Sequence, residues 1–193
     1  MEITSLSQLD LNKSYTYADY LTWQFKERVE LLKGKIFKMS PAPASNHQRI
    51  VRKISTSIDI FLSGKSCELF FAPFDVRLQK QSDDKSVTTI VQPDICVICD
   101  PKKIDKRGCN GAPELVIEIL SPGNSEKELG IKYELYEANG VLEYWLIDPE
   151  HEVVFIYRLK DGKFYAGKPY STLDVIQSDV LVGFEMNVSK IFG

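Results

Sequence analysis

The sequence predicts an α+β fold in which a mixed β-sheet is flanked by helices. Segments with helical spacing alternate with apolar runs of strand length, as in domains that pack helices on a sheet. The chain has 193 residues, 44% of them hydrophobic, which is enough to bury a core. We see no repeat, low-complexity segment or linker that would divide it, so we expect one domain over residues 1–193.

The first elements are expected to be a helix and a hairpin. A helix over residues 16–28 would be capped by Thr16. Residues 30–39 contain two short strand-like runs around Lys33 and Gly34, a pair that is typical of a tight turn.

A second helix is expected to begin at Ser45, because Ser45 and Gln48 have the spacing of a capping box. Its apolar stripe, which stops before Gly64, consists of Ile50, Ile54, Ile58 and Phe61. The chain then favours strands within residues 68–79, 90–100 and 114–122, with loops over residues 80–88 and 101–113 between them.

A third helix is expected over about residues 125–139. Ser125 and Glu128 have capping-box spacing, and Gly140 suits the position just after the helix. Three further predictions complete the chain: strands within residues 141–148 and 153–159, a hairpin turn at Asp161-Gly162, and an apolar tail over residues 180–192 that packs back on the domain.

The composition limits the classes of function. The formal net charge is -3, so any phosphate-binding surface would have to be a local patch. The N-terminus lacks the features of a secretory signal, and no run approaches the ~18 apolar residues of a membrane span. We therefore expect a cytoplasmic location and no membrane association.

Cys96 and Cys99 form a C-x-x-C pair, which invites a zinc interpretation. The pair lies in an apolar strand, however, where positions i and i+3 face opposite sides of the sheet. No second pair completes a set of four ligands. We therefore expect core cysteines.

Two acidic residues occupy apolar strands. Glu118 lies within LVIEIL, where an unpaired carboxylate would be costly; it is either ion-paired, at an exposed edge, or part of a site. Asp94 opens the neighbouring apolar run after Pro93 and alone would fit a simple turn. If the two strands are adjacent, the two carboxylates could hold Mg²⁺ or Mn²⁺.

Lys132 shares the inward stripe of the third helix with Leu129 and Tyr136. Its ammonium could simply extend to solvent. Alternatively it lies beside the carboxylates, where it would orient or activate an attacking water or offset charge on a phosphate.

Two runs, VQPDICVI and GAPELVIEILSPGNSEKELGIKYELYEANGVLEYWLIDP, resemble the Uma-type family of bacterial restriction endonucleases, within the PD-(D/E)XK nuclease-like superfamily. The resemblance extends from about Tyr15 to the final LVGFEMNVSKIF. It implies a restriction-endonuclease-like core, Mg²⁺ (or Mn²⁺) as cofactor, cleavage of nucleic acid with DNA as the expected substrate, and a homodimer.

The resemblance also implies catalytic residues. The implied metal ligands are Glu30, Asp94, Glu118 and the main-chain carbonyl of Ile119. The superfamily normally has a lysine two residues after the second acid, but Leu120 holds that position here. In this family the lysine comes from the following helix, which implies a catalytic role for Lys132.

Other residues are weaker candidates. The basic residues expected to contact nucleic acid near the mouth of the site are Lys102, Lys103, Lys106 and Arg107, although a short charge run is usually a solvated loop. His47 matches a family position, but we favour local hydrogen bonds at the start of its helix. For Tyr136 we favour a place in the core.

Two classes of function remain open. The first is a metal-dependent nuclease. The second is a non-enzymatic nucleic-acid-binding or interaction module on a nuclease-like scaffold, which the acidic net charge and Leu120 motivate. Metal-dependent hydrolysis of another phosphoester is a third, weaker hypothesis.

Overall fold

The computed structural model describes residues 2–39, 44–79, 81, 83–121 and 126–193. Its central sheet consists of β3 (Glu68–Phe71), β6 (Ile95–Ile98), β9 (Leu115–Ile119), β10 (Glu143–Asp148), β11 (Val153–Lys160) and β12 (Lys163–Ala166). The strand order is β12-β11-β10-β9-β6-β3, and only β9 and β10 are parallel neighbours. This mixed sheet confirms the predicted α+β class.

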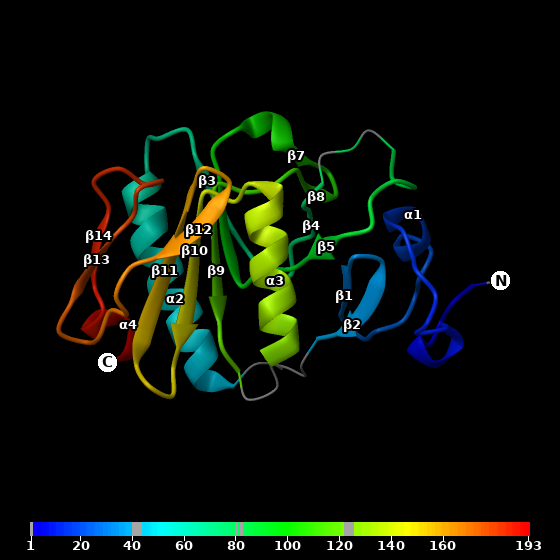
Figure 1. The fold of residues 1–193 in the computed structure, drawn as a ribbon, viewed down its shortest axis with the longest axis horizontal. Helices are drawn as coiled ribbons and strands as arrows, with labels where there is room; N and C mark the ends of the chain where they lie inside the picture. The colour runs from blue at the N-terminus through cyan, green and yellow to red at the C-terminus, as the bar shows by residue number, and fades with distance from the viewer. Residues whose placement is uncertain (1, 40–43, 80, 82, 122–125) are drawn as a thin grey trace.

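A second sheet lies beside the first (Figure 1). It consists of β1 (Val29–Leu32), β2 (Lys35–Lys38), β4 (Val76–Arg77), β5 (Ile90–Val91), β7 (Ile104–Asp105) and β8 (Gly108–Asn110). Its order is β2-β1-β5-β4-β8-β7, with β4 and β8 parallel. The sequence had not indicated that the strands would divide between two sheets.

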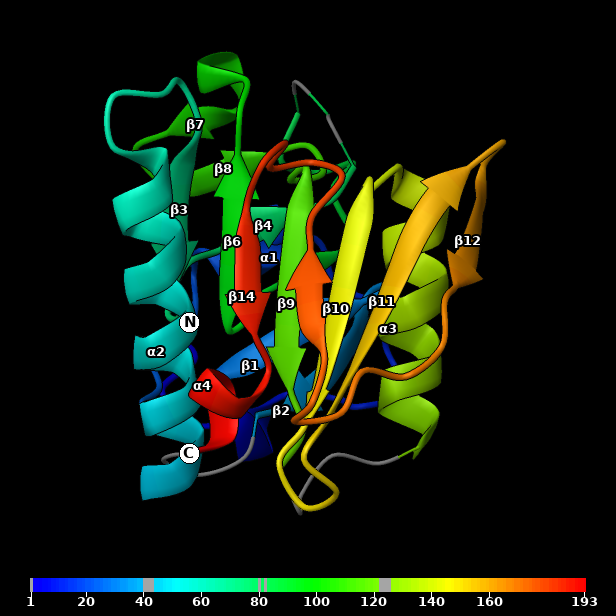
Figure 2. The same ribbon diagram turned by 90° about the vertical axis from the view of Figure 1, so that its left-hand side faces the viewer.

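The helices of the described residues are α1 (Tyr17–Tyr20), α2 (Ser45–Leu62), α3 (Glu126–Asn139), α4 (Ser189–Phe192) and two short 3₁₀ segments, Leu6–Gln8 and Pro101–Lys103. The long helix α2 packs on one face of the central sheet, while α3 and the second sheet face the other (Figure 2). None of the described helices is both long enough and apolar enough to cross a membrane.

Alternation along the strands of the central sheet builds a hydrophobic core on each of its two faces. Ile95 and Ile117 point toward α2, whereas Cys96 and Val116 point toward α3. The tail joins the α2 side, as predicted, through Phe184 and other buried side chains. It also forms a small hairpin from β13 (Val175–Gln177) and β14 (Glu185–Asn187).

Several local predictions are confirmed. Lys33 and Gly34 both have positive φ and turn the chain between β1 and β2. Asp161 and Gly162 do the same between β11 and β12. Gly140, at φ 82°, directly follows α3. The second capping box involves Ser125, which lies outside the described residues.

The predicted helix over residues 16–28 is wrong in extent. Thr16 does cap α1, but the helix ends at Tyr20. Beyond it the rings of Trp23 and Phe25 stack on one another, and Trp23 also contacts Tyr15 edge-on. The helical spacing of Tyr17, Tyr20, Leu21 and Phe25 favoured a longer helix. Pairing of Ile3 with Trp23 instead holds this part of the chain outside a helix.

The predicted capping box at Ser45 is also wrong. The cap position of α2 is Ala44, which provides no side-chain hydrogen bond, and Ser45 is already inside the helix. The apolar stripe is nevertheless correct, because Ile50, Ile54 and Ile58 are fully buried.

Two predicted strands are each divided between the sheets. Residues 68–79 give β3 and β4, separated by Pro73, which follows a cis peptide bond. Residues 90–100 give β5 and β6, separated by Pro93. Proline has no N–H to donate to a ladder, so both strands break where the chain passes from one sheet to the other.

The cysteines divide between the two faces. Cys96 is buried toward α3, and Cys99 lies on the α2 side, so the C-x-x-C residues face apart as predicted. Cys99 is more than a core residue, however, because it forms a disulfide with Cys67. Glu68 pairs with Ile98, which places the two cysteines opposite one another on β3 and β6.

Candidate functional site

The two strand carboxylates lie at one end of the central sheet. Ile95 pairs with Ile117 across β6 and β9, so Asp94 and Glu118 occupy the next position of that antiparallel ladder. The main-chain N–H of Ile119 donates to Oδ2 of Asp94 at 2.8 Å. The two acids therefore come together because their strands are neighbours, as the sequence predicted.

Lys132 joins these carboxylates from helix α3. Its side chain is buried, with 4% of the residue exposed, so its ammonium does not extend to solvent. Nζ lies 3.0 Å from Oε1 of Glu118 and 3.0 Å from Oε2 of Glu30. One turn later on the same face, the Tyr136 hydroxyl donates to Oε1 of Glu118 at 2.6 Å.

Glu30 comes from β1 of the second sheet and is almost completely buried. Its Oε1 accepts a hydrogen bond of 2.7 Å from the main-chain N–H of Gln92, and its Oε2 faces Lys132. Leu31 pairs with Ile90, so β1 lies beside the segment that leads into β6. The acid cluster, defined as Glu30, Asp94, Glu118 and Lys132, thus draws on both sheets and α3.

The charges of the acid cluster are unbalanced. Burial raises the pKa of Glu118 to about 7; Lys132 opposes this rise, and the charges of Asp94 and Glu30 add to it. Burial disfavours the Lys132 ammonium, but Glu118 and Glu30 outweigh that effect and raise the pKa of Lys132. Lys132 is therefore held as a cation, while three carboxylates compete for positive charge.

His47 reaches the cluster from α2. Its Nε2 lies 3.1 Å from Oδ2 of Asp94, and its buried Nδ1 has no hydrogen-bond partner among the described residues. The preference for local hydrogen bonds at the helix start is therefore wrong, because the imidazole turns toward the strand acid. Tyr136 is a core residue, as favoured, and also a direct partner of Glu118.

The donor chemistry of the cluster suits a hard divalent cation. Within the described part of the chain, Oδ1 of Asp94 and Oε2 of Glu118 have no hydrogen-bonding partner, so one oxygen of each acid is available. Both oxygens of Glu30 are engaged, and among the described residues no three His, Cys, Asp or Glu side chains form a ready metal-binding group. A third ligand role for Glu30 stays a prediction.

The basic loop lies at the opposite end of the sheet from the cluster. Asp94 directly precedes β6, whereas the loop follows the other end of that strand and leads back to the start of β9. Lys103 binds Glu114 at 2.5 Å, Arg107 binds Asp84 at 2.6 Å, and Lys102 and Lys106 are exposed. A position near the mouth of the site is therefore wrong, and a role in nucleic-acid binding stays a prediction.

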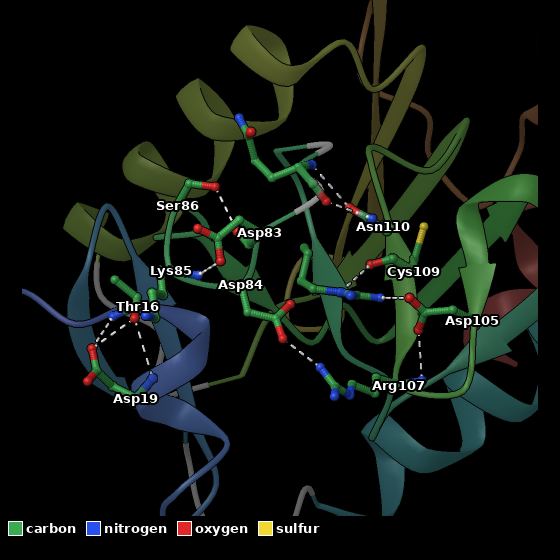
Figure 3. Close-up of polar contacts among 12 residues, drawn as sticks. Thr16, Asp19, Asp83, Asp84, Lys85, Ser86, Asp105, Arg107, Cys109 and Asn110 are labelled. Carbon is green, nitrogen blue, oxygen red and sulfur yellow. Dashed lines mark hydrogen bonds and ion pairs between the residues drawn. The ribbon is translucent and has the colours of Figure 1, made fainter.

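A cavity of about 670 Å³ opens beside this loop. Its lining includes Asp83, Asp84, Asp105 and Arg107, whose polar contacts are drawn in Figure 3. Its buried Arg77 donates to Asp105 at 2.6 Å. Because its arginines are already paired with acids, we assign the chemistry to the carboxylates and not to this cavity.

Sequence reasoning did not single out two buried polar residues. Gln92 holds Glu30 through its main-chain N–H. Glu143 lies on β10, and its carboxylate accepts hydrogen bonds from Trp145 and from residues 178–180, which fastens the C-terminal segment. An acid inside an apolar strand is the same signal for Glu143 as for Glu118, so only the partners distinguish a structural acid from a candidate site.

Comparisons with known proteins bear on the fold and the family of this chain. A protein of Synechocystis sp., named only "Uncharacterized protein slr1290", is 29% identical over 146 residues, covering 74% of this chain and 73% of its own. A crystal structure described as "a putative nuclease belonging to DUF820" from Anabaena variabilis shares the fold, with a TM-score of 0.71 and 20% identity over 92% of this chain and 97% of that one. The family model Uma2, described as "Putative restriction endonuclease", matches residues 17–189. The chain therefore belongs to the Uma2 family, as its sequence resemblance implied.

Proposed function

We propose that this protein is a Mg²⁺- or Mn²⁺-dependent endonuclease that hydrolyses phosphodiester bonds of DNA. The observation that carries the proposal is that Glu30 and Glu118 share the buried Lys132, while the charge of Asp94 acts on Glu118 from the neighbouring strand. Membership of a nuclease-like family supports the reaction class, and the donor chemistry supports the metal. Asp94 and Glu118 would hold the ion, with the main-chain carbonyl of Ile119 as a further oxygen and Glu30 beside them.

The protein's own groups have distinct roles in this proposal. A divalent ion supplies Lewis-acid stabilisation of charge on the phosphate oxygens. Lys132 acts as a hydrogen-bond donor and counter-charge to the phosphate, because its raised pKa keeps the ammonium protonated at neutral pH. Glu30 and Tyr136 hold Lys132 and Glu118 in position. Lys132 thus orients and stabilises, and does not serve as the base.

The test compares Glu118→Gln with Glu143→Gln. Both replace a buried strand glutamate by its amide, but only Glu118 belongs to the cluster. Wild type should cut plasmid or single-stranded DNA with Mn²⁺ or Mg²⁺, and Glu118→Gln should reduce the rate by about 10²-fold or more. Glu143→Gln should lose stability but keep cleavage when assayed below its unfolding temperature.

Calorimetric titration with Mn²⁺ gives an independent reading. Wild type and Glu143→Gln should bind the ion, whereas Glu118→Gln and Asp94→Asn should not. Equal cleavage by wild type and Glu118→Gln would contradict the assignment. DNA binding without cleavage or a Mn²⁺ site would instead support the non-enzymatic module.

The homodimer stays a prediction, which light scattering coupled to size exclusion would check.

A further inference from the structure

We propose that Arg28 is a phosphate-binding residue of the substrate site, held in place by Gln92; this rests on the proposed nuclease function. Arg28 directly precedes β1 and lies two residues before Glu30. Its main-chain oxygen accepts from the N–H of Met39, which continues the β1–β2 ladder, so the chain is extended there. In an extended chain, residues two apart point to the same side.

Gln92 connects the two side chains directly. Its main-chain N–H donates to Oε1 of Glu30 at 2.7 Å, and its Oε1 accepts from Nε and Nη2 of Arg28 at 3.1 and 2.7 Å. The guanidinium is thus one residue away from the acid cluster. Unlike Glu30, Arg28 is exposed, so a ligand in solvent can reach it.

The orientation of the Gln92 amide is determined by its other partners. Its Nε2 donates to Oδ1 of Asp75 at 2.8 Å and lies 3.3 Å from the Tyr20 hydroxyl oxygen. With the nitrogen facing an acid, the amide oxygen has to face Arg28. A buried amide therefore fixes the guanidinium before any substrate binds.

The contact with Gln92 does not neutralise the charge of Arg28, although that charge also acts on Asp75 and opposes the rise that burial causes in the pKa of its carboxyl. The acceptor is a neutral amide, and within the described residues no carboxylate forms an ion pair with Arg28. Asp75, the acid on the far side of Gln92, takes its hydrogen bonds from that amide and from Tyr20. Two of the five guanidinium N–H groups are used. The edge formed by Nη1 and the second N–H of Nη2 is left for a bidentate contact.

Carboxylate and phosphate oxygens both match a guanidinium fork, and phosphate is the one that a nucleic acid substrate supplies. A fixed, planar and exposed fork with a net positive charge matches two phosphate oxygens. Its place beside Glu30 predicts contact with a phosphate adjacent to the one that is cut. Such a contact contributes affinity without base preference. The DNA backbone would then follow the β1 side of the cluster and not the basic loop at the other end.

The experiment measures binding of labelled duplex DNA by fluorescence anisotropy in EDTA, over a series of salt concentrations. Arg28→Gln should raise Kd by about 5- to 20-fold and make the slope of log affinity against log salt shallower by about 1. Arg28→Lys should keep the slope but lose part of the affinity, because it keeps the charge without the fork. Gln92→Leu, which frees the guanidinium, should raise Kd by less than Arg28→Gln does.

Lys160→Gln is the matched control, because Lys160 is exposed and ends β11 at the opposite end of the sheet. It should leave Kd and slope at wild-type values. Unchanged binding by Arg28→Gln, equal changes in both variants, or no DNA binding by wild type would overturn the inference. If wild type cuts DNA while Arg28→Gln binds normally, only this inference fails. If wild type binds through Arg28 but never cuts, only the proposed function fails.

Discussion

The two ends of the central sheet differ in the balance between acidic and basic side chains. At the end where β9 finishes, Glu30 and Glu118 share Lys132, and Asp94 accepts from the Ile119 N–H, so the acids outnumber the lysine. Burial keeps water from screening the repulsion between them. This end therefore carries an excess of negative charge, which suits it to binding a cation.

At the other end, around the basic loop and the cavity, both arginines are paired with acids, while Lys102 and Lys106 are exposed. Arg77 pairs with Asp105, and Arg107 pairs with Asp84. Arg107 is also half-exposed, so its pair is screened by solvent. These contacts fasten the loop to the second sheet and leave little net charge in the cavity.

The difference teaches that the number of charged residues is a poor guide to a site. The basic loop looked like a binding surface in the sequence, yet folding pairs its arginine and one of its lysines with acids. The acid cluster has fewer charged residues, but its one lysine cannot neutralise three carboxylates. A site is better recognised by charge that the fold leaves unmatched.

The largest expected effect is from Lys132→Met. It leaves Glu30 and Glu118 buried without their shared cation, which should lower the free energy of unfolding by about 3–5 kcal/mol in EDTA. Saturating Mn²⁺ should restore part of this loss, because the ion replaces the missing charge. Urea unfolding with and without Mn²⁺ measures both effects, and unchanged stability would contradict the account of the cluster.

The next effect is on pH dependence. Burial raises the pKa of Glu118 in the folded protein to about 7 from an ordinary value of 4.5, so its ionisation destabilises the native state. Relative to Glu118→Gln, metal-free wild type should lose stability as pH rises from 4.5 through about 7, by up to about 3 kcal/mol. Urea unfolding of both proteins across this window is the measurement. A difference that stays constant with pH would argue against a raised pKa.

A smaller loss is expected at the other end. Arg77→Met removes the hydrogen bond from Nε to the buried Cys109 carbonyl, which should cost about 2 kcal/mol. Here Mn²⁺ should restore nothing, since no excess of acid is created in the interior. Equal rescue of Arg77→Met and Lys132→Met by Mn²⁺ would remove the distinction between the two ends.

The smallest effect is expected from Arg107→Gln. Its partner Asp84 and Arg107 itself are 35% and 52% exposed, so the loss should stay below about 1 kcal/mol and shrink further in high salt. Thermal unfolding at low and high salt would detect it. A loss as large as that of Arg77→Met would show that the exposed pair is more important than its screening allows.

Much of the fold was open to prediction because it depends on local patterns. The stripe of Ile50, Ile54 and Ile58 predicted α2. The pairs Lys33-Gly34 and Asp161-Gly162 predicted the two hairpin turns, where these residues have positive φ. Predictions failed where tertiary packing sets the bounds of an element. At Trp23, for example, aromatic contacts end the first helix early. The split of strands at Pro73 and Pro93 also depends on which sheet each half joins.

By itself the sequence determined which residues were candidates for a catalytic or metal-binding role. These were an acid in each of two apolar runs, a lysine on the inward stripe of a helix, and an early acid that only the family resemblance indicated. Only the tertiary structure decided that Glu30 and Glu118 share Lys132, that His47 turns to Asp94, and that the basic loop lies at the far end. The physical reason is the sequence separation of the residues that interact. Burial patterns and turns are local, whereas the balance of charge at a site depends on contacts between distant segments, which exist only after the two sheets and the helices have packed.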